Sequence, residues 1–433
     1  MPILNNRQAD FLSNKLIEAI PYKKEAIPSI VTKSRRNRLK RKISIAIPAE
    51  LPKETKELVR EILIETSKQG TTANLNIDIG VYERFSEAVA SDIVGKVNFN
   101  GCVFVKAGRE IEKIKKQADY IKNLKPKLKD LFPKIIDVRD KNGVCICLME
   151  LLGTYISLHE MIFKRYSDWQ IMNSIDGALE LISKIYSSEI DRKNIPQTKK
   201  LYQDLRIEES ISVGRERHKK EEIKIKNDWK DFFPNGIESL LTSKIKINDL
   251  LLEPFSVYQG ILSQKISLLS PDFITWIHGD LHPGNIMVNL NMPGSEIKLI
   301  DPNPDFEKGS DYLYDMGKLL HWLDMMGFII REREIGKPNE EIIKIDIKKD
   351  NDIINMSYII DQEYSDLRER FFNYTFGKIK DLGKTFNDTY LLPRLYLSIA
   401  SAYLGGLKYF TDFKHIIISY VEGIRYLNKI LDK

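Results

Sequence analysis

The sequence predicts an α+β protein in which strands gather in one part of the chain and helices fill most of the rest. Three short strand-like runs lie between Asn74 and Ala107. Helical patterns dominate residues 154–270 and return in residues 385–430, and a pair of apolar runs with a turn between them lies in residues 286–300. Strands and helices that occupy separate stretches of chain favour an α+β fold over a regular alternation of the two.

The composition is that of an ordinary globular protein of 433 residues, long enough for two or three domains. Hydrophobic residues make up 42% and charged residues 30%, and the net charge of +6 suits an anionic cosubstrate without demanding one. No run approaches the ~18 apolar residues of a membrane span, and the N-terminus has no signal-like segment. We therefore expect a cytoplasmic protein with no membrane partner.

The three cysteines form neither a disulfide framework nor a zinc motif. Cys102, Cys145 and Cys147 are odd in number and lie in apolar, strand-like contexts. The Cys-Ile-Cys spacing fits neither kind of site. We expect buried free thiols.

Residues 1–66 match no motif and form a predicted N-terminal extension. Its basic cluster, residues 34–42, has no aromatic residues among the charges. We therefore favour a solvated charge run over a contact with an acidic partner, and we expect no nucleic-acid partner. From Pro52 onward the apolar spacing predicts an amphipathic helix that packs on the next domain.

The strand-like runs that follow predict a small antiparallel sheet. The second and third runs are joined by Asn100-Gly101, the strongest short-range hairpin pattern. A helix is expected from Arg109 to Leu124 because its apolar residues recur at helical spacing. These residues are Ile111, Ile114, Ala118 and Ile121. A further buried-strand run, residues 144–149, ends at a loop.

A second hairpin is predicted much later in the chain. Two β-branched runs, residues 286–290 and 297–300, are separated by a turn that contains Pro-Gly. If the runs pair antiparallel, Asn285 enters the first strand and Asp301 leaves the second at the same open end. A carboxamide and a carboxylate would then share one small site.

A loop just before this hairpin carries a third oxygen-bearing side chain. The Pro283-Gly284 pair forces a tight reversal, so we expect Asp280 against the same end as Asn285 and Asp301. Oxygen ligands without a cysteine suit Mg²⁺, and Asn285 and Asp301 would hold this ion. Asp280 is then left to orient or deprotonate an attacking hydroxyl, which is the division of labour in phosphoryl transfer.

This stretch resembles a known family, the aminoglycoside phosphotransferase and choline kinase-like small-molecule kinases, which share the protein-kinase fold. The family's loop, H-G-D-x-x-x-x-N, is found at residues 278–285. Its metal-binding segment, an apolar pair followed by Asp, is Leu299-Ile300-Asp301. A further pattern, Gly, two or three residues, Tyr and Asp before an apolar helix, lies in residues 309–316. The order and spacing of the three patterns carry the resemblance.

The resemblance implies a two-lobed, protein-kinase-like α+β fold. The small antiparallel β-rich N-lobe would span residues 67–149 and the larger, mainly helical C-lobe residues 150–433, after a helical extension in residues 1–66. It also implies an enzyme that moves the γ-phosphate of ATP to a hydroxyl of a small polar metabolite, with Mg²⁺ as cofactor. GTP is the alternative donor, and a sugar, an aminoglycoside or an amino alcohol would be the acceptor.

The same resemblance assigns roles to single residues. Asp280 would be the catalytic residue, and Asn285 and Asp301 the metal ligands. Lys106 ends the third strand-like run and would anchor the phosphates. Ser86, in the loop expected to lie against those phosphates, would be a further contact.

In the family, a glutamate on the next helix pairs with the anchoring lysine, but family spacing places Gln117 there in this chain. Either the amide serves, or Glu110 substitutes from a different turn. Met149, Glu150 and Leu152 lie in the implied interlobe hinge, where backbone groups bind adenine.

Two further expectations concern the segment after the metal ligand. Asp301-Pro302-Asn303 departs from the Asp-Phe-Gly of protein kinases, because Pro302 fixes φ and Asn303 lacks the freedom of glycine. We therefore expect no switching segment and a constitutive enzyme. Asp315 opens an apolar helix, and we expect it to cap that helix or to brace the catalytic loop.

Three alternatives stay open. His278, Asp280 and His282 alternate along the chain and would suit a metal hydrolase, although catalytic zinc needs three protein ligands and the other histidines are scattered. On that view His278 is a ligand, whereas we favour a structural role for it. A protein or toxin-type kinase that acts on a macromolecule is the second alternative. The third is a non-catalytic nucleotide-binding pseudokinase, which Gln117 suggests.

Overall fold

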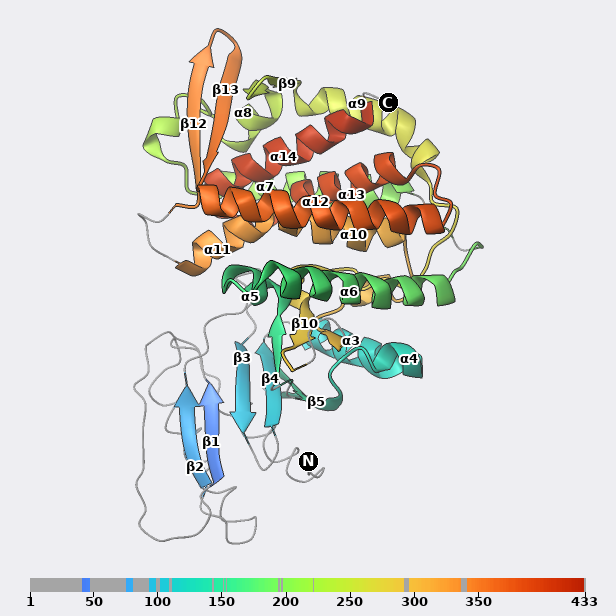
Figure 1. Cartoon of the computed structure of the whole chain (residues 1–433). Helices are drawn as coiled ribbons and strands as arrows, with labels where there is room; N and C mark the ends of the chain where they lie inside the picture. The colour runs from blue at the N-terminus through green and yellow to red at the C-terminus, as the bar shows by residue number, and fades with distance from the viewer. Residues whose placement is uncertain are drawn as a thin grey trace. The chain divides into compact units, whose positions relative to one another are not determined.

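Strands dominate the first part of the computed structural model and helices the remainder (Figure 1). The structure describes residues 41–46, 75–80, 93–98, 102–108, 111–141, 144–150, 152, 154–193, 195, 198–220, 222–291, 296–335 and 341–431. Ser86, Glu110, the helix expected from Pro52 and most of the basic cluster lie outside these residues. For the first four strands the backbone alone is described.

The chain divides into two compact units. Unit 1 comprises Met1–Tyr155 together with Asn289–Asn291 and Lys298–Pro304. Unit 2 comprises Ile156–Val288, Met292–Ile297 and Asp305–Lys433. The lobe bounds expected from the sequence stay a prediction, and residues 298–304 belong to unit 1 in the structure. The reason is local, since Leu299 N–H donates to the Leu131 carbonyl at 2.7 Å within that unit.

Unit 1 contains a six-stranded sheet with the order β2-β1-β3-β4-β6-β5. Its strands are β1 (Arg41–Ala46), β2 (Leu75–Gly80), β3 (Ile93–Asn98), β4 (Cys102–Gly108), β5 (Ile135–Lys141) and β6 (Val144–Glu150). β3 and β4 pair antiparallel, with Asn98 opposite Cys102, as the hairpin pattern predicted. β4, β6 and β5 continue the antiparallel pairing.

The edge of this sheet differs from the prediction. β1 falls within residues 1–66, which the sequence assigned to a helical extension, and it lies between β2 and β3. It pairs parallel with β2 and antiparallel with β3. Its sequence, RKISIA, alternates polar and apolar residues with the period of a strand. The neighbouring basic residues hid this short pattern.

Among the described residues of unit 1, a helix packs against strands of the sheet. α3 (Ile111–Asn123) buries Ile114, Ala118 and Ile121, as its apolar stripe predicted, and α4 (Pro126–Lys129) follows it. Ile114 and Ala118 form a core cluster with Cys147 and Met149 of β6. Cys147 is a buried free thiol, as expected.

Unit 2 is built mainly of helices. They are α5 (Leu158–Phe163), α6 (Asp168–Ser188), the π-helix η1 (Lys199–Glu208), α7 (Glu209–Lys219), α8 (Ile237–Thr242), α9 (Phe255–Lys265), α10 (Tyr312–His321), the π-helical turn η6 (Trp322–Met326), α11 (Gly327–Ile335), α12 (Gln362–Thr385), α13 (Leu391–Gly406) and α14 (Phe413–Leu431). Short 3-10 turns are η2 (Asn227–Trp229), η3 (Ile266–Leu269), η4 (Pro283–Asn285), η5 (Pro304–Phe306) and η7 (Leu407–Tyr409).

The core of unit 2 lies where α13 packs against α10 and α14 (Figure 1). α10 and α13 approach so closely that a Cβ at Gly317 would lie 2.0 Å from Ser398 Oγ. Leu397 and Leu404 of α13 are fully buried. This packing fixes α10, the helix that follows the predicted catalytic loop and the predicted metal-binding segment.

Two smaller sheets complete the chain. One has the order β11-β10-β7, with β7 (Tyr155–Ser157), β10 (Ile286–Asn289) and β11 (Ile297–Leu299). β10 and β11 are therefore neighbours, as the second predicted hairpin requires. The other has the order β12-β13-β8-β9, with β8 (Lys244–Ile247), β9 (Leu250–Leu252), β12 (Ile343–Asp350) and β13 (Ile353–Ile360).

Candidate active site

The predicted catalytic loop, residues 278–285, lies in unit 2 and ends in the 3-10 turn η4, which leads into β10. Gly279 has a φ of +78°, a conformation that residues with a side chain rarely adopt. Pro283 starts the turn with its fixed φ, and the His282 ring nitrogen Nδ1 accepts a hydrogen bond from Gly284 N–H at 3.1 Å. Glycine and proline thus shape the loop locally.

Asp315 fixes the backbone of the first residues of this loop. Its carboxylate accepts hydrogen bonds from His278 N–H at 2.7 Å, from Gly279 N–H at 2.8 Å and from the Tyr186 hydroxyl at 2.9 Å. Burial raises the pKa of Asp315, while these donors and His278 lower it. The bracing role predicted for Asp315 is confirmed. The helix cap is Asp311, which accepts from Leu313 N–H at 3.0 Å.

Asp280 has a different environment, half-exposed and beside a cation. The Lys318 Nζ lies 2.8 Å from Asp280 Oδ1, and His282 Nε2 lies 3.9 Å from Oδ2. Burial raises the pKa of Asp280, but Lys318 and His282 outweigh it and hold that pKa well below its usual range. Burial also lowers the pKa of His282 to about 4. At neutral pH Asp280 is therefore ionised and His282 is neutral.

Asn285 is fixed by the same loop. Its side chain is buried, and its Nδ2 donates a hydrogen bond to the Asp280 carbonyl at 2.9 Å. Because the amide nitrogen is used in this way, the Oδ1 atom is the one left to bind a metal. The backbone of the catalytic residue thereby orients its predicted metal ligand.

Asp301, the second predicted metal ligand, lies in unit 1 just after β11. Its φ of +55° is uncommon for a residue other than glycine, although aspartate adopts it more readily than most. The neighbouring Pro302 carbonyl accepts a hydrogen bond from the Gln117 side chain at 2.9 Å. Gln117, which the sequence considered only as a partner of Lys106, thus holds the segment that carries Asp301.

The predicted phosphate-binding residues are only partly described. Lys106 pairs in register with Cys147, whose side chain packs on Ile114 and Ala118 of α3. The strand position expected for the lysine is therefore beside α3. The Lys106 side chain, Ser86 and Glu110 are outside the described part. The phosphate contacts of Lys106 and Ser86, and the positioning of Lys106 by Glu110, therefore stay predictions.

Two of the predicted hinge residues, Met149 and Glu150, end β6, and Leu152 follows that strand. Met149 belongs to the core of unit 1, and Glu150 is exposed. The Glu150 N–H donates to the Lys134 carbonyl at 2.9 Å, and the Leu152 carbonyl accepts from Tyr155 N–H at 3.1 Å. The Glu150 N–H is thus engaged, whereas the Leu152 carbonyl keeps a second lone pair.

The metal-hydrolase alternative gains no site from the structure. Across the described residues, no three His, Cys, Asp or Glu side chains are grouped to hold a metal ion. His278 is buried, and its Nδ1 accepts a hydrogen bond from Asp280 N–H at 3.3 Å. This contact matches the structural role that we favoured for it.

Sequence reasoning missed two cations near Asp280. Lys318 follows Asp315 by three residues and so lies one helical turn further along α10. That spacing was visible in the sequence. Arg206 comes from η1, and nothing in the local sequence linked it to the catalytic loop.

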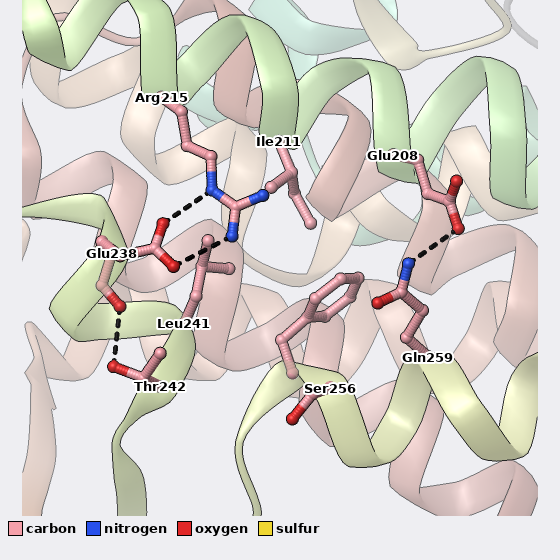
Figure 2. A pocket seen from close by; sticks show the side chains of 9 residues that line it. Glu208, Ile211, Arg215, Glu238, Leu241, Thr242, Ser256 and Gln259 are labelled. Atoms are coloured by element: carbon pink, nitrogen blue, oxygen red, sulfur yellow. Dashed lines mark hydrogen bonds and ion pairs between the residues drawn. The ribbon is translucent and has the colours of Figure 1, made fainter.

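A separate cavity of about 320 Å³ lies among η1, α7, α8 and α9. Its polar side chains are largely paired with one another, as Figure 2 shows. Arg215 forms a bidentate pair with Glu238, and Glu208 accepts from Gln259 at 3.0 Å. None of the predicted site residues lines this cavity.

Comparisons with known proteins gave structural matches only. No family model and no curated protein matches the chain. A thermostable aminoglycoside phosphotransferase mutant in its apo form has a TM-score of 0.42 at 7% identity, with 79% of this chain and 90% of that chain covered. A putative fructosamine-3-kinase from Haemophilus somnus has a TM-score of 0.31 at 13% identity, with 72% and 88% covered.

The third similar structure is a macrolide 2'-phosphotransferase type I. Its TM-score is 0.25 at 10% identity, with 72% of this chain and 86% of that chain covered. All three TM-scores lie under 0.5, so the functional argument rests on the residues of the chain itself. Among the helices described, none is long and apolar enough to cross a membrane.

Proposed function

We propose that this protein is an ATP- and Mg²⁺-dependent phosphotransferase that moves the γ-phosphate to a hydroxyl of a small polar metabolite. The observation that carries the proposal is the catalytic loop, in which an ionised Asp280 is held beside a buried, oriented Asn285. Asp315 fixes the loop backbone, so the arrangement of Asp280 and Asn285 is preorganised.

In this proposal Asp280 orients the acceptor hydroxyl and takes its proton. The acceptor oxygen forms a bond to the γ-phosphorus while the bond from that phosphorus to the β,γ-bridging oxygen breaks, and ADP leaves. The lowered pKa makes Asp280 a weak base. A weak base suits a loose phosphoryl-transfer transition state, in which the nucleophile needs positioning more than early deprotonation.

The residues proposed as metal ligands fit Mg²⁺. Asn285 offers Oδ1, and Asp301 offers a carboxylate on a backbone turn of unusual φ. Two oxygen ligands are enough, because Mg²⁺ keeps several waters and binds phosphate oxygens. When bound, the ion would neutralise charge on the phosphates.

The nucleotide contacts complete the proposal. Lys106 would bind the phosphates, with Ser86 beside them. Gln117 or Glu110 would position the lysine. Backbone groups near Met149 and Leu152 would bind the base, which we take to be adenine, with guanine as the alternative.

The test is ATP consumption by the wild-type protein with a panel of sugars, amino alcohols and aminoglycosides, with the phosphorylated product identified by mass spectrometry. Asp280→Asn is the matched inactive control, because it keeps the volume of the side chain. We expect a phosphorylated acceptor from the wild type alone. Phosphate on the protein itself or on a macromolecule would instead favour the protein-kinase alternative, and nucleotide binding without any turnover the pseudokinase.

A further inference from the structure

Arg206 is a half-buried arginine with an unusual setting. Its guanidinium stacks over the Tyr314 ring, 5.0 Å from the centroid, and near the Phe306 ring at 5.7 Å. Its aliphatic stem lies along Gly405 of α13, where an added Cβ would be 3.8 Å from Arg206 Cβ and 3.9 Å from Cδ. These contacts keep the guanidinium beside the two rings.

Within the part of the chain that the structure describes, no carboxylate forms an ion pair or a hydrogen bond with this arginine, although the charges of Asp280 and Asp305 act on it. Several other partly or fully buried arginines of unit 2 form ion pairs with carboxylates. Arg394 binds Asp311 and Asp388, Arg368 binds Asp324, and Arg217 binds Glu222. Arg206 therefore presents a fixed fork of N–H donors that no described carboxylate uses. Such a fork matches the two oxygens of a carboxylate or phosphate.

The position of Arg206 links it to the catalytic loop. Tyr314 and Lys318 are four residues apart on α10, so they lie on the same face of that helix. Lys318 contacts Asp280, and the Arg206 guanidinium lies over the Tyr314 ring. Burial lowers the pKa of Arg206, but Tyr314, Tyr409 and Asp280 raise it. Asp280 is thus close enough for its charge to act on the arginine.

The charges around Asp280 disfavour a polycationic acceptor. Lys318 already neutralises Asp280, and Asp315 is occupied by loop N–H groups. Asp305 also acts on Arg206, but it is exposed and forms no ion pair with it. An aminoglycoside would meet two fixed positive charges here, whereas an anionic group would meet an unused guanidinium.

We propose that the acceptor carries a phosphate or carboxylate group besides its reactive hydroxyl, and that Arg206 binds this anionic group. The inference rests on the proposed function, because it names the acceptor class of the same site. The substrate class is a hydroxyl compound that also carries a phosphate or a carboxylate, and sugar phosphates and sugar acids serve as probes. Arg206 acts as a specificity residue and takes no part in the proton transfer.

The first experiment measures binding and needs no turnover. Glucose, glucose 6-phosphate, glucuronate and inorganic phosphate are titrated calorimetrically into the wild type, Arg206→Lys and Arg206→Met. Arg215→Met is the matched control, since that arginine is paired with Glu238 (Figure 2). We expect at least one anion to bind the wild type about tenfold or more tightly than glucose, and Arg206→Met to lose that preference. Arg206→Lys should recover part of it, because lysine keeps the charge and loses the fork.

The second experiment compares kcat/KM for neutral sugars, the two anionic sugars and kanamycin. We expect Arg206→Met to raise KM for the anionic acceptors by a larger factor than for the neutral acceptors. Preference for glucose or kanamycin, or equal loss on every acceptor, would overturn the inference. Binding of anions that depends on Arg206, without turnover of any acceptor, would leave Arg206 as an anion-binding residue and overturn both the proposed function and the assignment of the acceptor. Equal binding of anions by wild type and Arg206→Met would overturn the inference alone.

Discussion

Two aspartates of the candidate site have similar chemistry and opposite surroundings. Asp315 is fully buried and accepts backbone and tyrosine donors, whereas Asp280 is half-exposed beside Lys318. A buried carboxylate whose acceptor sites are filled by N–H and O–H groups is a structural element. A carboxylate that keeps exposed surface and a single cation partner is available to a substrate. The environment of each residue therefore separates the brace from the catalytic group.

Lys318 is expected to position Asp280 for the acceptor. Lys318→Met removes the partner at 2.8 Å, so Asp280 loses its fixed orientation. We expect kcat to fall about 10- to 10²-fold, in the range of a misplaced catalytic group, with ATP affinity unchanged. Steady-state kinetics and nucleotide titration check this. Lys318→Arg, which retains the charge, should recover much of the rate, and loss of ATP binding by both variants would contradict a role at Asp280.

At the scale of elements, patterns of short range were readable in the sequence. The β3–β4 hairpin, the α3 stripe and the β10–β11 neighbours follow from periodicity and turn residues. The sheet that contains β12 and β13 was not predicted. Its β8–β13 pairing joins strands more than 90 residues apart, whereas the local β12–β13 hairpin was overlooked. β1 was hidden by the basic residues before it. Pairing between distant segments leaves little trace in any one of them.

The candidate site shows the same limit. Asp280, Asn285 and Asp301 stand in one stretch with a recognisable spacing, so sequence alone nominated them. Arg206 lies over 70 residues upstream and reaches the site only through packing on Tyr314. The Gln117 contact to the Pro302 carbonyl is likewise set by tertiary structure.

The contact of α10 with α13 predicts a steric penalty at Gly317. A Cβ there would lie 2.0 Å from Ser398 Oγ and 2.8 Å from the Ser398 carbonyl carbon, so the helices would have to separate. We expect Gly317→Ala to destabilise the protein by about 1–3 kcal/mol or more, measured by denaturant unfolding. Gly377→Ala on α12 is the control, because a Cβ there meets nothing within 4 Å. Equal stability of the two variants would show that α10 and α13 are not packed this closely.

Glu332 of α11 predicts a pH dependence of stability. Its carboxylate binds Lys414 of α14 at 2.7 Å and accepts from Ile342 and Ile343 N–H at 3.0 and 3.1 Å. Burial raises its pKa, but His415 and Lys414 outweigh this and lower the pKa from 4.5 to about 2. The lowered pKa stabilises the folded state above pH 4.5, and this contribution is lost as pH falls from 4.5 towards 2.

Glu332→Gln should therefore be less stable than wild type at pH 7, by about 2–3 kcal/mol for a broken buried pair. The difference should shrink as the pH is lowered through that window. Urea unfolding at several pH values measures it, with the exposed Glu307→Gln as control. A difference that stays constant from pH 7 to pH 2 would show that the carboxylate is not held as described.

At the scale of the whole molecule, the catalytic stretch supplies residues to both units. Asp280 and Asn285 belong to unit 2, and Asp301 belongs to unit 1 with the sheet and α3. Each unit fixes its own residues internally, through Asp315 and Lys318 in one and through Gln117 in the other. We therefore expect variants in the two units to fail in different ways.

Calorimetric titration of ATP with and without Mg²⁺, on wild type, Asp280→Asn and Asp301→Asn, tests the central claim most directly. We predict that Asp280→Asn binds Mg-ATP like the wild type while its turnover falls about 10²-fold or more, in the range of a general base. Asp301→Asn should lose the part of nucleotide affinity that depends on Mg²⁺ as well as turnover. Equal nucleotide binding by all three proteins, together with no turnover of any acceptor by the wild type, would contradict the phosphotransferase and favour a non-catalytic nucleotide-binding protein.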